Sequence, residues 1–285
     1  MAMEMEMIEN QRDREPILVL GGTGKTGRRV AERLSSAGYD VRIGSRSADP
    51  SFDWDNRATW TAALDGVEAV YVAFQPDLAV PGALETVQAF FAQAIESGAN
   101  RLVLLSGRGE PEAEDCEAAL KATSAEWTIL RASWFCQNFS ENFLLDAVLA
   151  GEIALPVGPV AEPFVDADDI ADMAFAALTQ PGHAYQLYDI TGPRALSFAD
   201  AVGEIAAATG RDIRFTQVSP EAYAAELKRL EMPKDYADLV MYLLTTVLDG
   251  RNTPLADGVE RALGRPPRDF SDYVRRTAAT GIWSV

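Results

Sequence analysis

Residues 17–27 read ILVLGGTGKTG, an apolar run that leads directly into a cluster of glycines. Consecutive Ile, Leu and Val residues over 17–20 are typical of a strand buried on both faces, as in a parallel sheet covered by helices. The residues that follow, 25–37, have the apolar spacing of an amphipathic helix. A buried strand, a glycine-rich turn and a helix together predict the opening of a dinucleotide-binding α/β fold.

The glycines fit two spacings, Gly22-x-Gly24-x-x-Gly27 and Gly21-x-x-Gly24-x-x-Gly27. In either spacing they permit a tight turn and let backbone N–H groups approach a pyrophosphate at the positive end of the helix. A tight turn without a cofactor is the alternative. An ATP-binding P-loop is disfavoured, because it needs a glycine where Val19 stands. The predicted cofactor loop comprises Gly21, Gly22, Thr23, Gly24, Lys25, Thr26 and Gly27.

The same alternation of strand and helix continues to about residue 140. Further strands are expected at 41–43, 69–74, 101–106 and 127–131, with helices at 81–97 and 112–124. This pattern predicts an α/β protein with a Rossmann-type, doubly wound parallel sheet.

The rhythm changes in the second half of the chain. Residues 151–170 are rich in Pro and Gly and suggest irregular connections, and a helix at 168–178, a strand at 185–190 and Ala-rich helices follow. We predict a disordered extension at 1–15 and a dinucleotide-binding domain at 16–150 whose sheet also takes strands from later residues. The remainder, 151–285, is expected to be mainly a smaller, helical, substrate-binding lobe.

The charge balance excludes several classes of partner. The chain has 25 Lys and Arg against 43 Asp and Glu, a formal net charge of −18, with one His and two Cys. Nucleic acids and anionic membrane surfaces are bound by clustered Lys and Arg, which this sequence lacks. One His and two Cys provide neither a metal site nor a disulfide framework. No apolar stretch is long enough to span a membrane, and we expect a cytoplasmic protein.

The residues after the second expected strand bear on the choice of cofactor. An NAD-specific site places an acidic residue about 20 residues after the glycine loop, where it binds the ribose hydroxyls. This sequence has Ser45 and Arg46 there instead. An arginine can pair with the 2′-phosphate of NADP, and a serine can donate a hydrogen bond to it. NADP(H) is therefore the expected cofactor. NAD(H) is the alternative, and a solvated loop is the alternative role of Arg46.

Several motifs resemble those of the NmrA-like branch of the atypical short-chain dehydrogenase/reductases. Among such proteins, the chain is most similar to bacterial members of secondary metabolism and to fungal ergot-alkaloid reductases. The motifs are GGTGKTG at 21–27, LLSGRG at 104–109, WTILRASWFCQNFSENF at 127–143, PFVDADDIADMAFAAL at 163–178, YDITGPRALSFADAV at 188–202 and RDFSDYVRRTAATGIW at 268–283.

The resemblance implies a cofactor across the carboxyl ends of the strands and a substrate under a C-terminal lobe. It also implies that Ser133, Trp134 and Phe135 flank the nicotinamide, with core packing as the alternative role of the two aromatic residues. The other cofactor contacts that it implies are Phe74, Gln75, Ser106 and Gly107. We predict that the residues that contact a flat aromatic substrate are Trp134, Phe135, Asn138 and Phe139.

The proton donor is the least defined part of the predicted site. Classical members of the superfamily use a Tyr-x-x-x-Lys pair, in which the lysine lowers the phenol pKa. None of the 8 tyrosines here has a lysine four residues on. Cys116 and Ser106 are the remaining catalytic candidates, and a buried structural thiol is the alternative role of Cys116. The single histidine, His183, precedes a late strand and is expected to be exposed.

Two functions remain open from the sequence. The first is an NADPH-dependent oxidoreductase that reduces an aromatic, quinone-like or iminium intermediate in natural-product tailoring, with a flavin or oxygenase partner where the overall step is a hydroxylation. Such acceptors take hydride with little acid assistance, which suits a site without Tyr and Lys. The second is a non-enzymatic NADP-binding redox sensor that reports to a protein partner. The sequence leaves the oligomeric state undetermined.

Overall fold

The computed structural model describes residues 15–141 and 144–285, so the predicted extension at 1–15 lies, apart from Glu15, outside the described residues. The chain divides into two compact units. Unit 1 comprises 15–106, 112–131 and 170–188, and unit 2 comprises 107–111, 132–169 and 189–285. The predicted single boundary near residue 150 differs from this division, because the chain passes between the units several times.

Unit 1 is built on a six-stranded sheet. The strand pairs that flank β1, and the pair β3 and β4, are parallel, with Ile17 level with Val41 on one side and with Ala69 on the other. All four residues of β1 and of β3 are buried, which explains their continuous apolar sequences. In spatial order the strands are β2 (Val41–Gly44), β1 (Ile17–Leu20), β3 (Ala69–Val72), β4 (Arg101–Gly107), β5 (Glu126–Ala132) and β8 (Gln186–Ile190).

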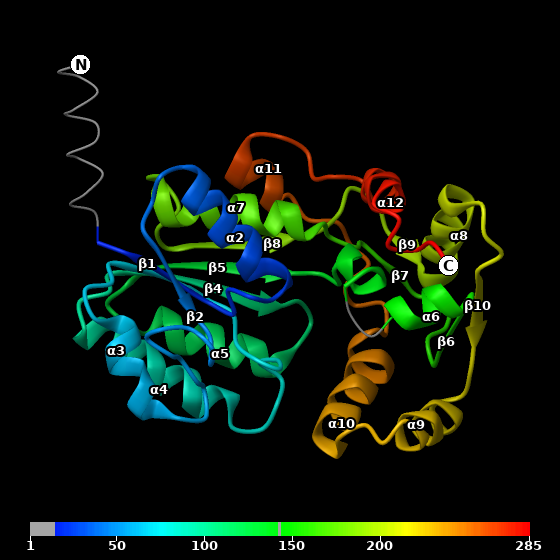
Figure 1. Ribbon diagram of the computed structural model, residues 1–285, viewed down its shortest axis with the longest axis horizontal. Coiled ribbons are helices and arrows are strands. Elements are labelled where there is room, and N and C mark those ends of the chain that lie inside the picture. Colours follow the sequence, from blue (N-terminus) through cyan, green and yellow to red (C-terminus); the bar gives the residue numbers. More distant parts are fainter. Residues whose placement is uncertain (1–14, 142–143) are drawn as a thin grey trace. The chain divides into compact units, whose positions relative to one another are not determined.

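Helices cover both faces of this sheet. Figure 1 shows α3, α4 and α5 on one face, and α2 and α7 on the other. The strand order reverses direction between β1 and β3, which makes their carboxyl ends the switch point where doubly wound sheets bind ligands. The predicted Rossmann-type sheet is confirmed. The helical segments of unit 1 are α2 (Lys25–Ser36), η1 (Arg57–Thr59), α3 (Trp60–Leu64), α4 (Ala83–Glu96), α5 (Pro111–Lys121) and α7 (Ala167–Thr179).

Unit 2 combines helices with two small sheets. Strand β6 pairs in parallel with β10, and β7 pairs antiparallel with β9, so part of the segment expected to be irregular forms strands. The strands are β6 (Glu152–Leu155), β7 (Ala161–Glu162), β9 (Leu196–Ser197) and β10 (Arg214–Gln217). The helical segments are η2 (Cys136–Phe139), α6 (Leu145–Ala150), α8 (Phe198–Thr209), α9 (Pro220–Arg229), α10 (Lys234–Tyr242), the π-helix η3 (Leu243–Val247), α11 (Gly258–Leu263) and α12 (Phe270–Ala279).

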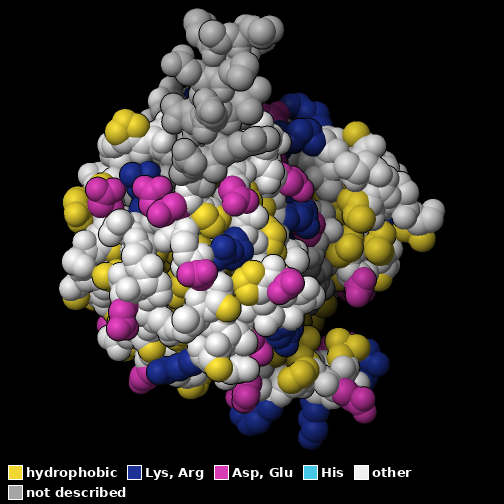
Figure 2. Space-filling model, turned by 60° about the vertical axis from the view of Figure 1, so that its left-hand side comes forward, with side chains coloured by type: hydrophobic (Ala, Val, Ile, Leu, Met, Phe, Trp, Pro, Cys, Tyr) yellow, Lys and Arg dark blue, Asp and Glu magenta, His cyan; other side chains and the backbone are white. Residues whose placement is uncertain are grey.

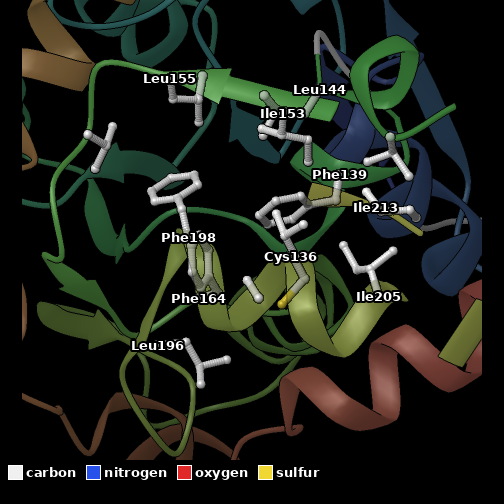
Figure 3. Packing of buried hydrophobic residues seen from close by; sticks show 14 of the residues in the cluster. Cys136, Phe139, Leu144, Ile153, Leu155, Phe164, Leu196, Phe198, Ile205 and Ile213 are labelled. Carbon is white, nitrogen blue, oxygen red and sulfur yellow. The ribbon is translucent and has the colours of Figure 1, made fainter. Parts of the chain in front are cut away.

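Aromatic rings form the centre of the unit 2 core. The ring centroid of Phe139 lies 5.6 Å from that of Phe164, 6.0 Å from that of Phe198 and 5.7 Å from that of Phe270. Figure 3 shows Phe139, Phe164 and Phe198 packed beside Cys136 among aliphatic side chains. The indole N–H of Trp283 donates to the Phe139 carbonyl at 2.9 Å. These contacts anchor η2 and the C-terminal residues in one core.

The surface carries both signs of charge. On the face shown in Figure 2, acidic and basic side chains are interspersed rather than gathered by sign. Over 15–141 and 144–285, no helix has both the length and the apolar character that a membrane crossing requires.

Candidate functional site

The glycine loop forms a tight turn between β1 and α2 in unit 1. Gly21 has a φ of +66°, the left-handed conformation that favours glycine. The Gly24 N–H donates to the Gly21 carbonyl at 2.8 Å, and the Gly21 N–H donates to the Gly44 carbonyl of β2 at 3.2 Å. The loop is therefore fixed to the end of the neighbouring strand.

Two further glycines allow close approach within this turn. A Cβ on Gly27 would lie 2.2 Å from the Gly21 carbonyl oxygen, and a Cβ on Gly22 would lie 2.9 Å from the Ile43 side chain. Both spacings found in the sequence thus contain glycines that the packing requires. Of the other loop residues, Thr23 is exposed, Lys25 is half-buried and Thr26 is buried.

The start of α2 offers donors to an anion. Its N-cap, Gly24, makes no side-chain cap, and the first turn has no acidic residue. The first backbone N–H groups of a helix have no partner within it, and the helix dipole makes this end positive. This arrangement fits the pyrophosphate of a dinucleotide.

The carboxyl ends of β2 and β3 bring further predicted residues to the loop. Strand β2 ends at Gly44, level with Leu20 of β1, so Ser45 and Arg46 follow beside the loop. Arg46 is exposed, and within 15–141 and 144–285 its guanidinium has no ion pair or hydrogen bond. A Cβ on Gly24 would lie 3.6 Å from the Gln75 amide nitrogen. Ser45, Arg46 and Gln75, all predicted to contact the cofactor, are therefore placed next to the glycine loop.

Phe74 and Gly107, also predicted to contact the cofactor, lie near the carboxyl ends of β3 and β4. Phe74 is half-buried, and its ring lies 4.9 Å from that of Trp54. Gly107 is the last residue of β4, and a Cβ there would meet the Glu110 carboxyl at 2.3 Å. Phe74 therefore combines packing with a partly open face, and Gly107 lies directly against the Glu110 carboxyl.

Ser106 belongs to a buried polar cluster that the sequence did not indicate. Its hydroxyl donates to Glu117 Oε1 at 2.7 Å. Arg131 holds the same carboxylate with two bonds, Nε to Oε1 at 2.8 Å and Nη2 to Oε2 at 2.5 Å. Lys121 Nζ lies 3.6 Å from Oε2. Ser106 thus has its proton directed at Glu117, which leaves its oxygen able to accept a hydrogen bond from a ligand. An arginine within the apolar run WTILR was the available signal.

Cys116, the second catalytic candidate, has its side chain in the apolar core of unit 1. It is fully buried on α5, and burial together with nearby carboxylates raises the pKa of its thiol to about 12. This placement corresponds to the alternative of a structural thiol and argues against a proton-transfer role.

The predicted substrate residues of unit 2 differ in exposure. Trp134 is half-buried and packs edge-on against Phe198, with ring centroids 5.7 Å apart. Phe135 and Asn138 are also half-buried. The prediction that Phe139 contacts the substrate is corrected, because its ring is fully buried in the aromatic core. Trp134, Phe135 and Asn138 remain as predicted substrate contacts.

Sequence reasoning missed Glu162, which lies beside Trp134. Its side chain is 1% exposed, and the Trp134 N–H approaches its Oε1 at 3.5 Å. Burial raises the pKa of this carboxyl to about 7, although the Trp134 N–H, Arg108 and the Ser133 hydroxyl each lower it. A single glutamate in a Pro- and Gly-rich segment gives no sequence signal for this environment.

His183 lies in the interior of unit 1. His183 is buried rather than exposed, because its Nδ1 lies 3.0 Å from the Tyr188 hydroxyl and its carbonyl accepts from Thr128. Within the described ranges, no cluster of three or more His, Cys, Asp or Glu side chains has the arrangement of a metal site.

Comparison with known proteins identifies relatives along nearly the whole chain. No family model matches the sequence. The chain is 33% identical to the uncharacterized oxidoreductase YesF of Bacillus subtilis over 94% of this chain and 98% of that protein. It is 29% identical to the NAD(P)H azoreductase of Xenophilus azovorans, over 92% and 98%. Identity to festuclavine dehydrogenase of Aspergillus fumigatus is 31%, over 92% and 98%.

Solved structures share the fold at lower identity. The structure of an NADPH-dependent quinone oxidoreductase of Escherichia coli with NADPH matches with a TM-score of 0.73 and 19% identity, over 91% of this chain and 99% of that one. Triphenylmethane reductase of Citrobacter sp. in complex with NADP(H) matches with a TM-score of 0.72 and 18% identity, over 92% and 99%. These likenesses concern the fold alone.

Proposed function

The chain belongs to the NmrA-like branch of the atypical short-chain dehydrogenase/reductases, and from this premise we propose that it is an NADPH-dependent reductase of flat, electron-poor aromatic acceptors, quinone-like or iminium. The observation that carries the proposal is the turn from Gly21 to Gly27, with Arg46 exposed beside it. When bound there, NADPH supplies a hydride.

The turn and the other predicted site residues each have a defined task in the proposal. The backbone N–H groups at the start of α2 bind the pyrophosphate, and Arg46 pairs with the 2′-phosphate. Ser106, whose proton is held by Glu117, presents its oxygen as an acceptor to the carboxamide of the nicotinamide. Trp134 and Phe135 provide aromatic faces for the acceptor.

The acceptor class is supported by the chemistry of the relatives. Relatives at 29–31% identity are named NAD(P)H azoreductase, festuclavine dehydrogenase and agroclavine dehydrogenase, and by analogy we propose acceptors with a conjugated, electron-poor double bond. Acceptors of this type delocalise the charge that they gain, so they need less protein assistance than a simple ketone does. We extend the proposal to a tailoring step in natural-product synthesis, where reduction of a quinone to its hydroquinone completes a hydroxylation begun by a flavin or oxygenase partner. The expected cytoplasmic location stays a prediction.

The sensor is the outcome that the activity test must separate from the enzyme. YesF, the azoreductase and festuclavine dehydrogenase, at 29–33% identity, match nearly the whole chain. All three are oxidoreductases by name. We therefore propose the enzyme and keep the sensor as an alternative result.

The first prediction is turnover of a flat acceptor. Under anaerobic conditions, purified protein is expected to oxidise NADPH with quinones, azo compounds or cyclic iminiums, and to use NADPH more efficiently than NADH. Initial rates across this panel, followed by the loss of reduced-nicotinamide absorbance, provide the measurement. Tight cofactor binding without turnover of any acceptor would favour the sensor and reject the reductase.

The second prediction concerns the charge at residue 46. The Arg46→Ala variant is expected to weaken NADPH binding by about 1–3 kcal/mol, a loss of roughly 5- to 150-fold, because a charged hydrogen-bond partner of the 2′-phosphate is removed. NADH binding is expected to stay unchanged. Titration of both cofactors by calorimetry measures the two effects.

A matched variant controls for the loss of positive charge from unit 1. Arg57 is also exposed, and its guanidinium lies over the Trp60 ring at 5.5 Å. Arg57→Ala is expected to leave the preference for NADPH intact. Equal weakening of NADPH and NADH in the Arg46→Ala variant would contradict the assignment of Arg46 to the 2′-phosphate.

A further inference from the structure

Reduction of a quinone or azo compound needs a proton as well as a hydride. The chain has no Tyr-x-x-x-Lys pair. Cys116 is fully buried in the core of unit 1, and the Ser106 hydroxyl donates to Glu117. Neither of the two catalytic candidates named from the sequence is therefore placed to donate a proton.

Glu162 has the chemistry of a proton donor that works near neutral pH. Glu162 is the last residue of β7, and its side chain is almost completely buried. Because burial removes the carboxyl from water, it disfavours the ionised form. Burial raises its pKa to about 7, so protonated and ionised forms are both populated at neutral pH. An acid donates most effectively when its pKa is close to the working pH.

Arg108 is near enough to attract this carboxyl but is held by other groups. Its Nη1 donates to the Asn252 carbonyl at 2.6 Å, and its Nη2 donates to the Pro254 carbonyl at 2.8 Å. The Asn252 side chain donates back to the Arg108 carbonyl at 2.8 Å. Its Nε lies 4.0 Å from Asp189 Oδ1, so all three guanidinium nitrogens face groups other than Glu162, and Arg108 acts on the Glu162 carboxyl through its charge alone. This explains why Glu162 is not fixed as a carboxylate by a direct ion pair.

The same segment fixes the strand that carries Glu162. Thr253 donates its hydroxyl proton to the Ala161 carbonyl at 2.7 Å, and the carbonyl of Glu162 accepts from the Phe164 N–H at 3.0 Å. The backbone around the carboxyl is thus tied on both sides. A fixed acid is what proton transfer to a defined atom requires.

Ser133 connects Glu162 to the predicted substrate residues. It follows β5 directly, precedes Trp134, and is 2% exposed. Its hydroxyl lowers the pKa of the Glu162 carboxyl, yet no described residue forms a well-aligned hydrogen bond with its oxygen. A buried hydroxyl without a partner is uncommon in native proteins. Such a hydroxyl can accept a proton from the acid beside it while donating its own to a ligand.

We propose that Glu162 supplies the proton that accompanies hydride transfer, and that the Ser133 hydroxyl passes it to the reduced acceptor. This inference rests on the proposed reductase function. The acceptor gains a hydride from NADPH, which leaves as NADP⁺, and an O–H or N–H bond forms on the acceptor as the Glu162 O–H bond breaks. Water reprotonates the carboxylate before the next turnover.

The test compares acceptors that need a proton with acceptors that do not. A quinone or azo compound requires both hydride and proton, whereas an iminium or triphenylmethane cation becomes neutral by hydride addition alone. Glu162→Gln is expected to reduce kcat with the quinone by roughly 10²-fold or more, and kcat with the cationic acceptor by less than about twofold. The wild-type rate with the quinone should fall as the pH rises through about 7, and the variant should lose this transition.

Two further variants locate the effect. Ser133→Ala is expected to slow quinone reduction while preserving turnover of the cation. Glu152→Gln is the matched control in unit 2, because Glu152 is exposed and bonds to Thr216 at 2.7 Å. It is expected to behave as wild type with both acceptors. Calorimetric NADPH binding and thermal unfolding establish that each variant is folded.

An infrared titration provides a readout that needs neither cofactor nor turnover. The wild-type protein should show a protonated carboxyl band that disappears with a midpoint near pH 7, and Glu162→Gln should lack it. Equal losses with both acceptors, no loss with the quinone, or no carboxyl titrating near pH 7 would overturn the role of Glu162. Absence of wild-type turnover with every acceptor overturns the reductase itself, and the proton role with it.

Discussion

An Arg131→Ala variant is expected to lose about 4 kcal/mol of folding free energy, because it leaves a buried carboxylate without its main partner. The Glu117 side chain is 1% exposed and is held by Arg131 at 2.5 and 2.8 Å. Lys121, at 3.6 Å, and the Ser106 hydroxyl remain after the substitution, but neither replaces the two-pronged guanidinium. Thermal unfolding should shift downward by about 10 °C.

A surface pair of the same type provides the control. Arg229 binds Glu226 through Nε at 2.7 Å and Nη2 at 2.5 Å, but both side chains are largely exposed. Arg229→Ala should therefore change stability by less than about 1 kcal/mol. Replacing Arg131 and Glu117 together by Leu should restore most of the loss, since the buried charge disappears with its partner. If Arg131→Ala is no more harmful than Arg229→Ala, Glu117 is not held in the way described.

Gly27→Ala is expected to cost about 3 kcal/mol and to weaken NADPH binding by at least about tenfold. The added Cβ would lie 2.2 Å from the Gly21 carbonyl oxygen and 2.9 Å from the Gly22 Cα. Both contacts are with backbone, so the β1–α2 turn must open to accommodate the methyl group. Opening this turn also moves the N–H groups that face the phosphates. Urea unfolding and calorimetric cofactor titration measure the two losses.

Gly203 in α8 supplies the matched substitution. A Cβ there meets no atom within 4 Å, so alanine should stabilise this helix by about 0.5–1 kcal/mol through its higher helix propensity. NADPH binding should not change. Normal stability and binding in Gly27→Ala would show that the turn tolerates a side chain and is not the phosphate-binding loop proposed.

The strands of unit 1 were predictable because buried strands have continuous apolar sequences. Continuous Ile, Leu and Val residues mark β1, and the structure places it at 17–20, as expected. The expected strand at 69–74 ends at Val72, since the polar Gln75 and the aromatic Phe74 leave the sheet. The pairing of β6 with β10 joins residues about sixty positions apart through four-residue strands, and such short, distant partners have no periodic signal.

The site was predictable only where local backbone chemistry decides it. The glycine loop has a sequence pattern because steric constraints act within a few residues. The bond between Arg131 and Glu117 joins two elements, and the pKa of Glu162 depends on enclosure by tertiary structure. Phe139 was misassigned for the same reason, because an aromatic residue after a strand can face a ligand or the core with the same sequence.

The interleaving of the two units has a consequence for the biosynthesis of the chain. The polypeptide passes from one unit to the other at 106/107, 111/112, 131/132, 169/170 and 188/189. During translation, β8 and most of α7 emerge only after the first part of unit 2, so unit 1 cannot be completed before residue 188 has left the ribosome. No single break in the gene yields either unit intact. Exchanging one half of the gene by recombination would therefore split both units. A new activity must instead arise by point substitutions or by replacement of internal segments.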